Sequence, residues 1–446
     1  MDSDQDPEFG GADVLDVMAR ANRREDFSAR RPAQYTNWID EQLSWKETCY
    51  VGSWSSFANL LLEGPEAIDL LADLSINSFA DYPVGGGKHL VQCDEDANVV
   101  AEGVLVREGA ETFVVHGVPA YWTAFNLETG DYDATCEFRD TFNYGIQGPN
   151  SLEVLDALAD HSLREVGFMR SGDIEIAGVD VTAVRFGMSG ELGFELHGPG
   201  EHSERVWNAI LEAGEEYGIR RLSSGTSSIN QLEAGIPSRV RDFVSAIFGA
   251  EMADYRAYLR EHQTRDLITH AVEGSFEADD ISDYYRTPVE LGWDRYTKFD
   301  HDFVGREALE AEAADPQRVL VTLEWNDEDV IDVYASLFRE GPTGKYMEMP
   351  HQQKRSMIAD RVLKDGEDVG VATMRGYSYY FRQMLSLATV DVEHADPGTE
   401  LTVLWGEGEN PASPTVEDHV QTEVRATVAE TPYKEDNRRK DLSQEE

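Results

Sequence analysis

The chain has 446 residues, of which 41% are hydrophobic, and its 86 aspartates and glutamates against 38 lysines and arginines give a formal net charge of −48. This length predicts roughly two to four domains, and the acidity argues against nucleic acid as a partner, because phosphates require a basic footprint. The acidic residues are spread along the whole chain. This favours a salt-rich cytoplasm, where molar salt screens charges beyond about 3 Å, over an acidic protein of an ordinary cell.

Neither a membrane segment nor a metal site is predicted. No apolar run approaches the roughly 18 residues that span a bilayer, and the N-terminal sequence MDSDQDPEFGG lacks the apolar core of a signal peptide. We therefore expect a cytoplasmic protein with no membrane partner. The cysteines at 49, 93 and 136 are isolated, which argues against a disulfide framework or structural zinc.

The first part of the chain predicts an α+β arrangement. A polar lead-in at 1–30 contains one short helix near 13–21. The further predicted elements, in chain order, are a strand at 56–64, a helix at 64–74, a hairpin at 101–117, a helix at 148–158 and an amphipathic helix at 203–218. The helices at 64 and 148 both start with Gly-Pro, which hints at two related domains, placed at 31–180 and 181–320.

The predicted secondary structure changes after about residue 320. There, strand patterns such as VGVATMRGYSYYF and GTELTVLWG follow one another with little helix between them. Residues 321–433 therefore predict a separate small barrel or sandwich. The remaining residues, 434–446, are highly charged, and their composition predicts disorder.

The segment GMSGELGFELHGPG (187–200) raises a chemical question. Its strand-like core alternates, so that Glu195 shares a face with Gly193 and His197 among apolar neighbours. A carboxylate buried there without a partner costs several kcal/mol. Glu195 is therefore either an exposed strand residue, paired for example with Arg185, or a ligand-binding group.

The order of several segments resembles the folate-binding T-protein superfamily, which comprises glycine-cleavage aminomethyltransferases and tetrahydrofolate-dependent demethylases. The segments are GIQGPNSLEVL (145–155), RFGMSGELGFEL (185–196) and TPVELGWDRYTKFDHDFVGREAL (287–309). YTNWIDEQLSWKET (35–48), GSFEADDISDYY (274–285) and TELTVLWGE (399–407) are most similar to aryl-methyl-ether O-demethylases. The resemblance implies a three-domain cloverleaf, with two ferredoxin-like α+β domains and a C-terminal β-barrel around a folate cavity.

The resemblance also implies roles for cofactor-site residues. Glu195 takes the place of the acid that grips the pterin ring, and Arg185 aligns with a family arginine that either contacts the cofactor or forms a structural salt bridge. Glu102 and Gly103 stand where T-proteins carry two aspartates; the demethylases also have glycine at the second place. Ser227 occupies the catalytic position that is arginine in T-proteins and tyrosine in demethylases, and a serine cannot act as a phenol-like acid of pKa about 10.

The substrate side departs from the family pattern. Ser53 and Ser56 stand where the demethylases have glutamine and histidine, and the arginine expected to hold an aryl carboxylate is absent. His116 and Tyr121 lie near that position and are candidate substitutes, although a lone histidine is more often structural.

The sequence therefore predicts an enzyme that moves a methyl group from a small O-, N- or S-methyl donor to tetrahydrofolate. Two alternatives stay open. One is an aminomethyltransferase of glycine cleavage, which would need a carrier protein as partner; the other is a non-catalytic folate-binding factor for assembly or repair.

Overall fold

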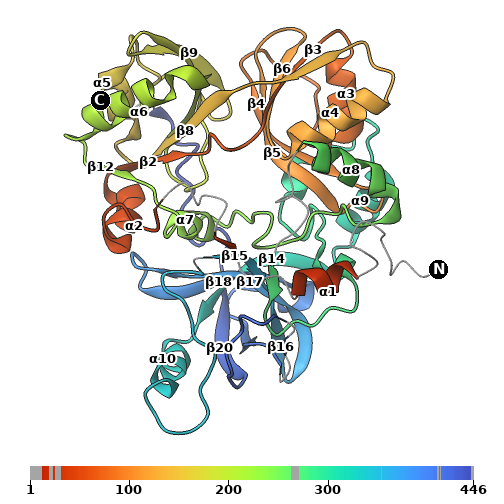
Figure 1. Ribbon diagram of the computed structural model, residues 1–446, viewed down its shortest axis with the longest axis vertical. Helices are drawn as coiled ribbons and strands as arrows, with labels where there is room; N and C mark the ends of the chain where they lie inside the picture. The colour runs from red at the N-terminus through yellow and green to blue at the C-terminus, as the bar shows by residue number, and fades with distance from the viewer. Residues whose placement is uncertain are drawn as a thin grey trace.

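The computed structural model describes residues 13–19, 24–25, 32–262, 271–352, 354–408, 411 and 413–442. Two sheets lie side by side at one end of the molecule and a closed barrel lies at the other (Figure 1). The α+β class with a C-terminal β-barrel is thus confirmed. Of the predicted lead-in, most residues lie outside the described ones; the predicted helix is α1 (Val14–Ala19).

The first sheet has six strands in the order β12-β2-β8-β11-β10-β9. Their bounds are β2 (Cys49–Ser53), β8 (Thr141–Gln147), β9 (Ser171–Ile176), β10 (Val179–Val184), β11 (Gly193–Pro199) and β12 (Ile219–Arg221). Helices α5 (Ser151–Leu158) and α6 (Ser203–Gly214) pack on one face over a buried core that includes Phe142, Phe194 and Leu196. The opposite face is therefore the one available to a site.

The second sheet has five strands in the order β4-β5-β6-β3-β7. Their bounds are β3 (Asn59–Glu63), β4 (Gly87–Cys93), β5 (Val99–Arg107), β6 (Thr112–Gly117) and β7 (Thr135–Phe138). Helices α3 (Ala67–Leu74), α4 (Pro119–Thr129) and α8 (Ala253–Glu261) share a core with this sheet. The predicted hairpin at 101–117 is formed by β5 and β6.

The two sheets are not consecutive along the chain. The chain starts the first sheet with β2, builds the whole second sheet at 59–138 and returns with β8. The boundary expected at 180/181 therefore falls inside β10 of the first sheet. Strand periodicity identifies elements, but it does not say which sheet each strand joins, and the expected division differs from the observed one for that reason.

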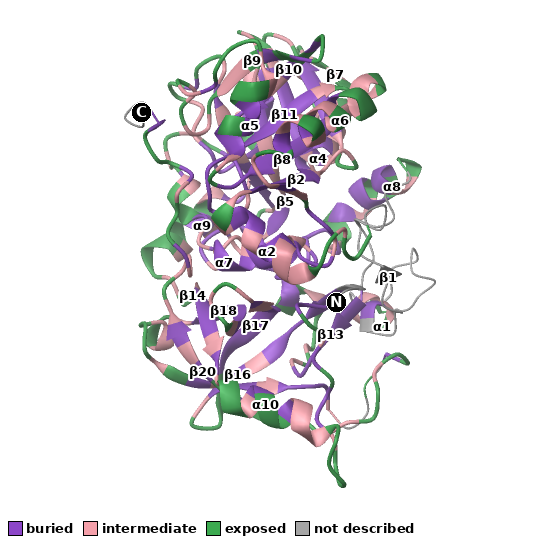
Figure 2. Cartoon of the chain, turned by 90° about the vertical axis from the view of Figure 1, so that its left-hand side faces the viewer, coloured by how far each residue is buried: buried purple, intermediate pink, exposed green. Residues whose placement is uncertain are grey.

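The C-terminal unit is a closed six-stranded barrel in the order β14-β18-β17-β16-β19-β20. Its elements are β14 (Arg318–Trp325), α10 (Asp327–Ser336), β16 (Asp360–Lys364), β17 (Glu367–Ser378), β18 (Gln383–Asp391), β19 (Glu400–Trp405) and β20 (Thr422–Ala429). A small sheet, β1 (Arg24–Glu25), β15 (Lys354–Ile358) and β13 (Ala271–Glu273), lies beside it. Burial follows the strands, whereas α10 carries exposed residues (Figure 2).

Three more helices connect these units: α2 (Trp38–Glu47), α7 (Ser227–Glu233) and α9 (Arg306–Ala314). In the described part of the chain, no helix combines the length and the apolar character that crossing a bilayer requires.

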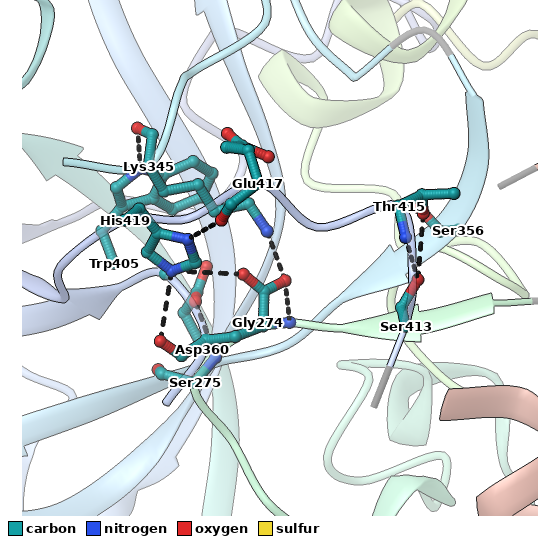
Figure 3. A network of polar contacts seen from close by, with 12 residues as sticks. Gly274, Ser275, Lys345, Ser356, Asp360, Trp405, Ser413, Thr415, Glu417 and His419 are labelled. Atoms are coloured by element: carbon teal, nitrogen blue, oxygen red, sulfur yellow. Dashed lines mark hydrogen bonds and ion pairs between the residues drawn. The ribbon is translucent and has the colours of Figure 1, made fainter. Parts of the chain in front are cut away.

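A buried polar network fastens the barrel to the segment after β13 (Figure 3). Glu407 forms an ion pair with Lys345 and accepts a hydrogen bond from the Gly274 backbone N–H at 3.1 Å. The Ser275 N–H donates to Asp360 at 3.1 Å. Burial raises the pKa of the Asp360 carboxyl to about 7, although the nearby Lys345 charge opposes this shift.

The charged C-terminal residues differ from the expectation of disorder at 434–446. Residues 434–442 pack against the first sheet and α7: Leu442 joins the core under the sheet, and Lys434 is buried 3.5 Å from Glu233. Composition predicted solvation, but these charged groups find buried partners about 200 residues away in sequence. Residues 443–446 lie outside the described residues.

Candidate active site

The candidate site lies on the face of the first sheet that the helices do not cover. In the antiparallel pair β8–β11, Glu195 is opposite Gly145, His197 is opposite Asn143, and Gly193 is opposite Gln147. Paired residues point to the same side of a sheet, and alternate residues point to opposite sides. The apolar residues between them, such as Phe194, enter the helix-covered core, so the polar side chains gather on the other face.

Small residues make room for this polar group. A Cβ at Gly145 would lie 2.9 Å from the Trp54 ring and 3.1 Å from Nε2 of Gln147. A Cβ at Gly193 would lie 2.5 Å from Cγ of Gln147. Glycine is therefore required beside Glu195 because the neighbouring side chains lie over the strand backbones.

Glu195 is a buried carboxyl group. Burial raises its pKa to about 7, and a hydrogen bond with the Asn143 side chain opposes that shift. Nε2 of His197 lies 3.9 Å from Oε2 of Glu195. Burial, and to a smaller extent the repulsion that a protonated His116 would exert, hold the pKa of His197 well below its usual range. This contact is therefore between a carboxyl and a neutral imidazole, and it does not supply Glu195 with a cation.

The second sheet contributes His116, from the end of β6. Its ring stacks on His197 with the ring centroids 4.2 Å apart, and its Nδ1 contacts Oδ1 of Asn59. Burial lowers the pKa of His116 to about 4, so this ring is also neutral near pH 7. The two sheets thus meet at a pair of neutral imidazoles next to Glu195.

Several buried polar atoms at this place have no hydrogen-bond partner within the part of the chain that the structure describes. They are Oδ1 of Asn143, Nε2 of Gln147 and both ring nitrogens of His197. Buried polar groups are normally satisfied, and leaving one unsatisfied costs about 1–3 kcal/mol. A cluster of such atoms beside a buried carboxyl is suited to a ligand that carries several donors and acceptors.

Of the residues predicted for the site, the structure brings together Glu195 and His116. Arg185 lies elsewhere: its guanidinium donates to the backbone carbonyls of Val166, Arg438 and Lys440. Its observed contacts are therefore structural, between β10 and the C-terminal segment.

Glu102 and Ser227 occupy different surroundings. Oε2 of Glu102 accepts a hydrogen bond from Nε2 of His89 at 3.0 Å, and the His89 ring lies edge-on against Trp293. Ser227 is the first residue of α7 and is half-buried. The next residue, Ser228, lines a small cavity that also touches Arg375 of the barrel.

The predicted substrate residues do not gather around His116. Ser53 is paired with Tyr144, on the helix-covered face of the sheet, and its hydroxyl lies 3.1 Å from that of Ser55. Ser56 is exposed. Tyr121 belongs to α4, where its ring packs on Phe138 with the centroids 5.1 Å apart.

The sequence analysis missed Asn143, Gln147 and Asn59. A signal for the first two was present, since FNYGIQ alternates polar or small residues with apolar ones, as GFELH does. Two neighbouring strands with this pattern predict one polar face. Nothing in the sequence pairs Asn59 with His116, because that contact depends on the register of β3 with β6.

Comparisons with known proteins agree with this architecture. The family model of the GCVT N-terminal domain matches residues 14–252. A syringate O-demethylase from Sphingobium sp. is 36% identical, and the match covers 94% of this chain and 96% of that protein. A sesamin methylene transferase from Sinomonas sp. is 34% identical over 90% of each protein.

More distant similarities include an aminomethyltransferase from Corynebacterium aurimucosum, 26% identical over 65% of this chain and 71% of that protein. Among solved structures, the glycine cleavage system aminomethyltransferase T from Bartonella henselae superposes with a TM-score of 0.63 at 16% identity, covering 90% of each chain. At that identity the likeness shows the fold alone.

Proposed function

The chain belongs to the GCVT N-terminal domain family, and from that membership we propose that it transfers a methyl group from a small O-methylated aromatic donor to tetrahydrofolate. The observation that carries the proposal is the buried carboxyl of Glu195, which lies among buried polar atoms that have no partner in the described part of the chain. The two relatives that cover nearly the whole chain are named for a demethylation and a methylene transfer, which supports one-carbon chemistry.

The residues present fit a pterin ring. Its edge offers an amino group beside a ring N–H, and an ionised carboxylate has two acceptor oxygens that match this pair. Such charge-assisted hydrogen bonds offset the cost of burying Glu195. Tetrahydrofolate, when bound, supplies N5 as the methyl acceptor.

The chain itself contributes positioning. The sheet strands fix Glu195 and its neighbours, so that a bound ring is held in one orientation, and burial keeps water from competing for the carboxylate. Departure of an aryl oxygen is helped by a proton donor. Ser227 at the start of α7 lacks the phenol that the demethylase pattern places there, so the proton must come from another group or from water.

Gly103 disfavours aminomethyl transfer. A Cβ at this position would press on the carbonyl oxygen of His116 and lie 3.0 Å from Pro119. No side chain fits, so the second carboxylate of the T-protein pattern cannot stand there without a shift of the backbone. A methyl donor does not need that carboxylate.

The proposal is tested with purified protein in molar salt, supplied with tetrahydrofolate and a panel of donors. The panel contains methoxybenzoates such as syringate, an onium methyl donor, and an aminomethylated lipoyl carrier protein. We expect methyl-tetrahydrofolate and the demethylated phenol from a methoxybenzoate, and no product with Glu195→Gln. Methylene-tetrahydrofolate from the carrier would instead identify an aminomethyltransferase, and tight folate binding without any turnover would identify a folate-binding factor.

A further inference from the structure

His89 and Glu102 form a pair of an imidazole and a carboxylate on the second sheet. Nε2 of His89 lies 3.0 Å from Oε2 of Glu102, and an ionised carboxylate can only accept, so Nε2 carries the hydrogen. Nδ1 of His89 has no hydrogen-bond partner among the described residues. The two side chains are 14% and 22% exposed, so the pair is shielded but within reach of a ligand. One ring nitrogen is thus held by Glu102, and the other is available.

The register of the second sheet turns the His89–Glu102 pair towards the first sheet. His89 is opposite Val104, Val104 is opposite His116, and paired residues point to the same side of a sheet. Glu102 lies two residues before Val104 and therefore shares that side. His116 stacks on His197 of the first sheet. His89, whose backbone lies two strands or roughly 10 Å from that of His116, thus faces the space between the sheets.

A further contact places the His89–Glu102 pair on the Glu195 side of that space. Gly87, two residues before His89, points the same way, and a Cβ there would lie 3.5 Å from Cγ1 of Val184. Val184 is the direct strand partner of Glu195. The pair and Glu195 therefore face the same space from opposite sheets.

Neighbouring residues fix the position of His89 on β4, which is an edge strand. The Asn77 side chain donates to the His89 carbonyl at 2.8 Å and accepts from the Val91 N–H at 3.0 Å, so it takes the place of a neighbouring strand. The rings of Trp293 and Tyr296 pack nearly perpendicular to the imidazole, with centroid distances of 5.0 and 5.2 Å. These contacts limit the rotation of the imidazole and the access of water.

The His89–Glu102 pair differs from the two stacked imidazoles as a source of protons. Burial lowers the pKa of His116 to about 4 and holds that of His197 well below its usual range, so both rings are neutral near pH 7. A neutral imidazole is a poor acid. Glu102 instead places a carboxylate against His89, where it can compensate the charge of the protonated ring and determine which nitrogen faces away.

We propose that His89 donates a proton to the aryl oxygen of the methyl donor and that Glu102 positions the imidazole. The inference rests on the proposed function and names the acid that Ser227 cannot provide. The O–CH3 bond breaks with its electron pair left on the aryl oxygen, which takes the proton from Nδ1 of His89. The methyl carbon forms its new bond to N5 of tetrahydrofolate, and His89 regains the proton released from N5, directly or through water. The products are the phenol and methyl-tetrahydrofolate.

The first test varies the acidity of the leaving phenol. Ring-substituted methoxybenzoates are supplied with tetrahydrofolate, and the rate of demethylation is plotted against the pKa of each phenol. A general acid contributes about 10²–10⁴-fold, and it is needed most when the leaving group is basic. In His89→Gln, whose amide can still donate to Glu102, the rate should fall by about 100-fold or more with an electron-rich ring and by less than about tenfold with a nitro-substituted ring.

Two further variants show whether the pair itself is responsible. Glu102→Gln should steepen the dependence to a smaller extent, because the imidazole remains while the residue that positions it has changed. The matched control is His161→Gln, since Nδ1 of His161 lies 3.0 Å from Oδ1 of Asp160 and both side chains are more than half exposed. The control should have the wild-type slope. Because donors are compared within one variant, a loss of folded protein does not change the slope.

The second test does not depend on turnover. The analogue 4-hydroxy-3-nitrobenzoate absorbs at longer wavelength when its phenol is ionised, so its spectrum reports the charge beside the bound oxygen. A protonated His89 should favour the ionised phenol, and the bound analogue should therefore ionise at a lower pH than it does in solution. His89→Gln should remove this difference, while tetrahydrofolate affinity measured by calorimetry should stay within about twofold of the wild-type value.

Equal slopes in the wild-type protein and both variants of the pair, or a bound nitrophenol whose ionisation His89→Gln leaves unchanged, would overturn the assignment of His89 and leave the proposed function intact. A wild-type protein that forms no methyl-tetrahydrofolate from any methoxybenzoate would refute the proposed function, and His89 would then have no leaving group to protonate.

Discussion

At the scale of single residues, the behaviour of the site depends on the protonation of Glu195. Burial raises its pKa to about 7 in the unliganded protein, so the carboxyl is largely protonated below that pH and loses an acceptor. Binding to two ligand donors requires the ionised form. Ligand binding must therefore lower the pKa of Glu195, and a proton leaves the site when the ligand binds near neutral pH.

This linkage predicts a pH-dependent affinity. Between about pH 8 and about pH 6, tetrahydrofolate affinity should fall by about tenfold per pH unit once the pH is below the pKa of Glu195. In Glu195→Gln the binding free energy of tetrahydrofolate should be less favourable than in the wild-type protein by about 2–4 kcal/mol. The affinity of this variant should not depend on pH over this range. Calorimetry in buffers of different ionisation enthalpy measures both the affinity and the released proton.

Glu201→Gln is the control, because Glu201 is exposed in the 3-10 turn before α6. It should behave as the wild-type protein does. A pH profile that persists in Glu195→Gln would assign the titration to another group and remove Glu195 from the pterin proposal.

At the scale of elements, the sequence predicts features that depend on neighbouring residues, such as the alternation of a strand. It does not predict contacts between segments that lie far apart in the chain. The alternation in 192–196 correctly placed Glu195 and His197 on one face, because period-two geometry is local. The stacking of His116 on His197 depends on two different sheets, and the contacts of Arg185 depend on carbonyls about 250 residues away. Neither leaves a trace in the spacing of residues, so Arg185 was open to interpretation as a cofactor contact.

The C-terminal segment, residues 434–442, is the clearest case of long-range contacts that the sequence composition does not predict. The side chains of Lys434 and Glu233 are each less than 3% exposed, and Glu233 also accepts hydrogen bonds from Trp45 and Ser378. Asn437 binds Glu191 in the loop next to Ser189 at 2.8 Å. A segment whose composition predicts disorder therefore supports this loop, whose Ser189 backbone N–H donates to Oε1 of Gln147 in the candidate site at 2.9 Å.

Removing the charge of Lys434 should weaken both folding and ligand binding. Lys434→Met leaves Glu233 buried with Lys46 as the nearest other cation, at 3.9 Å, and we expect a loss of about 3 kcal/mol in the free energy of unfolding. Tetrahydrofolate affinity should fall as well, since the loop loses its support. Urea denaturation in molar salt measures the first effect and calorimetry the second.

Two further variants separate charge from packing. Adding Glu233→Gln to Lys434→Met removes the buried carboxylate that has lost its nearer cation, so part of the lost stability should return. Lys364→Met, at a lysine that donates to the Glu400 carbonyl near the barrel surface, should change the free energy of unfolding by less than about 1 kcal/mol. If Lys364→Met and Lys434→Met lowered the free energy of unfolding by the same amount, the buried ion pair would not stabilise the fold more than a surface contact does.

At the scale of the whole molecule, the interleaved topology couples the units. The first sheet is completed only after the second has been built between β2 and β8, and the candidate site uses residues of both. The family resemblance predicted three units in a cloverleaf, but the boundary between the first two was not predictable from composition. Any interaction that destabilises the packing of the two sheets should therefore also disrupt the candidate site.

Repulsion between the carboxylates that give the chain its net charge of −48 is such an interaction. The screening length is about 10 Å at 0.1 M salt and about 3 Å at 1 M, so the surface carboxylates repel one another mainly in dilute salt. Buried pairs such as Lys434–Glu233 are screened much less. We therefore expect the melting temperature to rise between about 0.1 M and about 2 M potassium chloride, with tetrahydrofolate affinity recovering in parallel.

The cause can be localised with a charge variant at the end of α6. Glu212, Glu215 and Glu216 are exposed there, where the helix dipole already disfavours negative charge. Replacing all three by glutamine should raise the melting temperature in dilute salt and have little effect in molar salt, because screening has then already removed the repulsion. If the wild-type melting temperature did not change with salt, or the variant gained as much in molar salt as in dilute salt, charge repulsion would not limit this fold, and adaptation to a salt-rich cytoplasm would lose its physical basis.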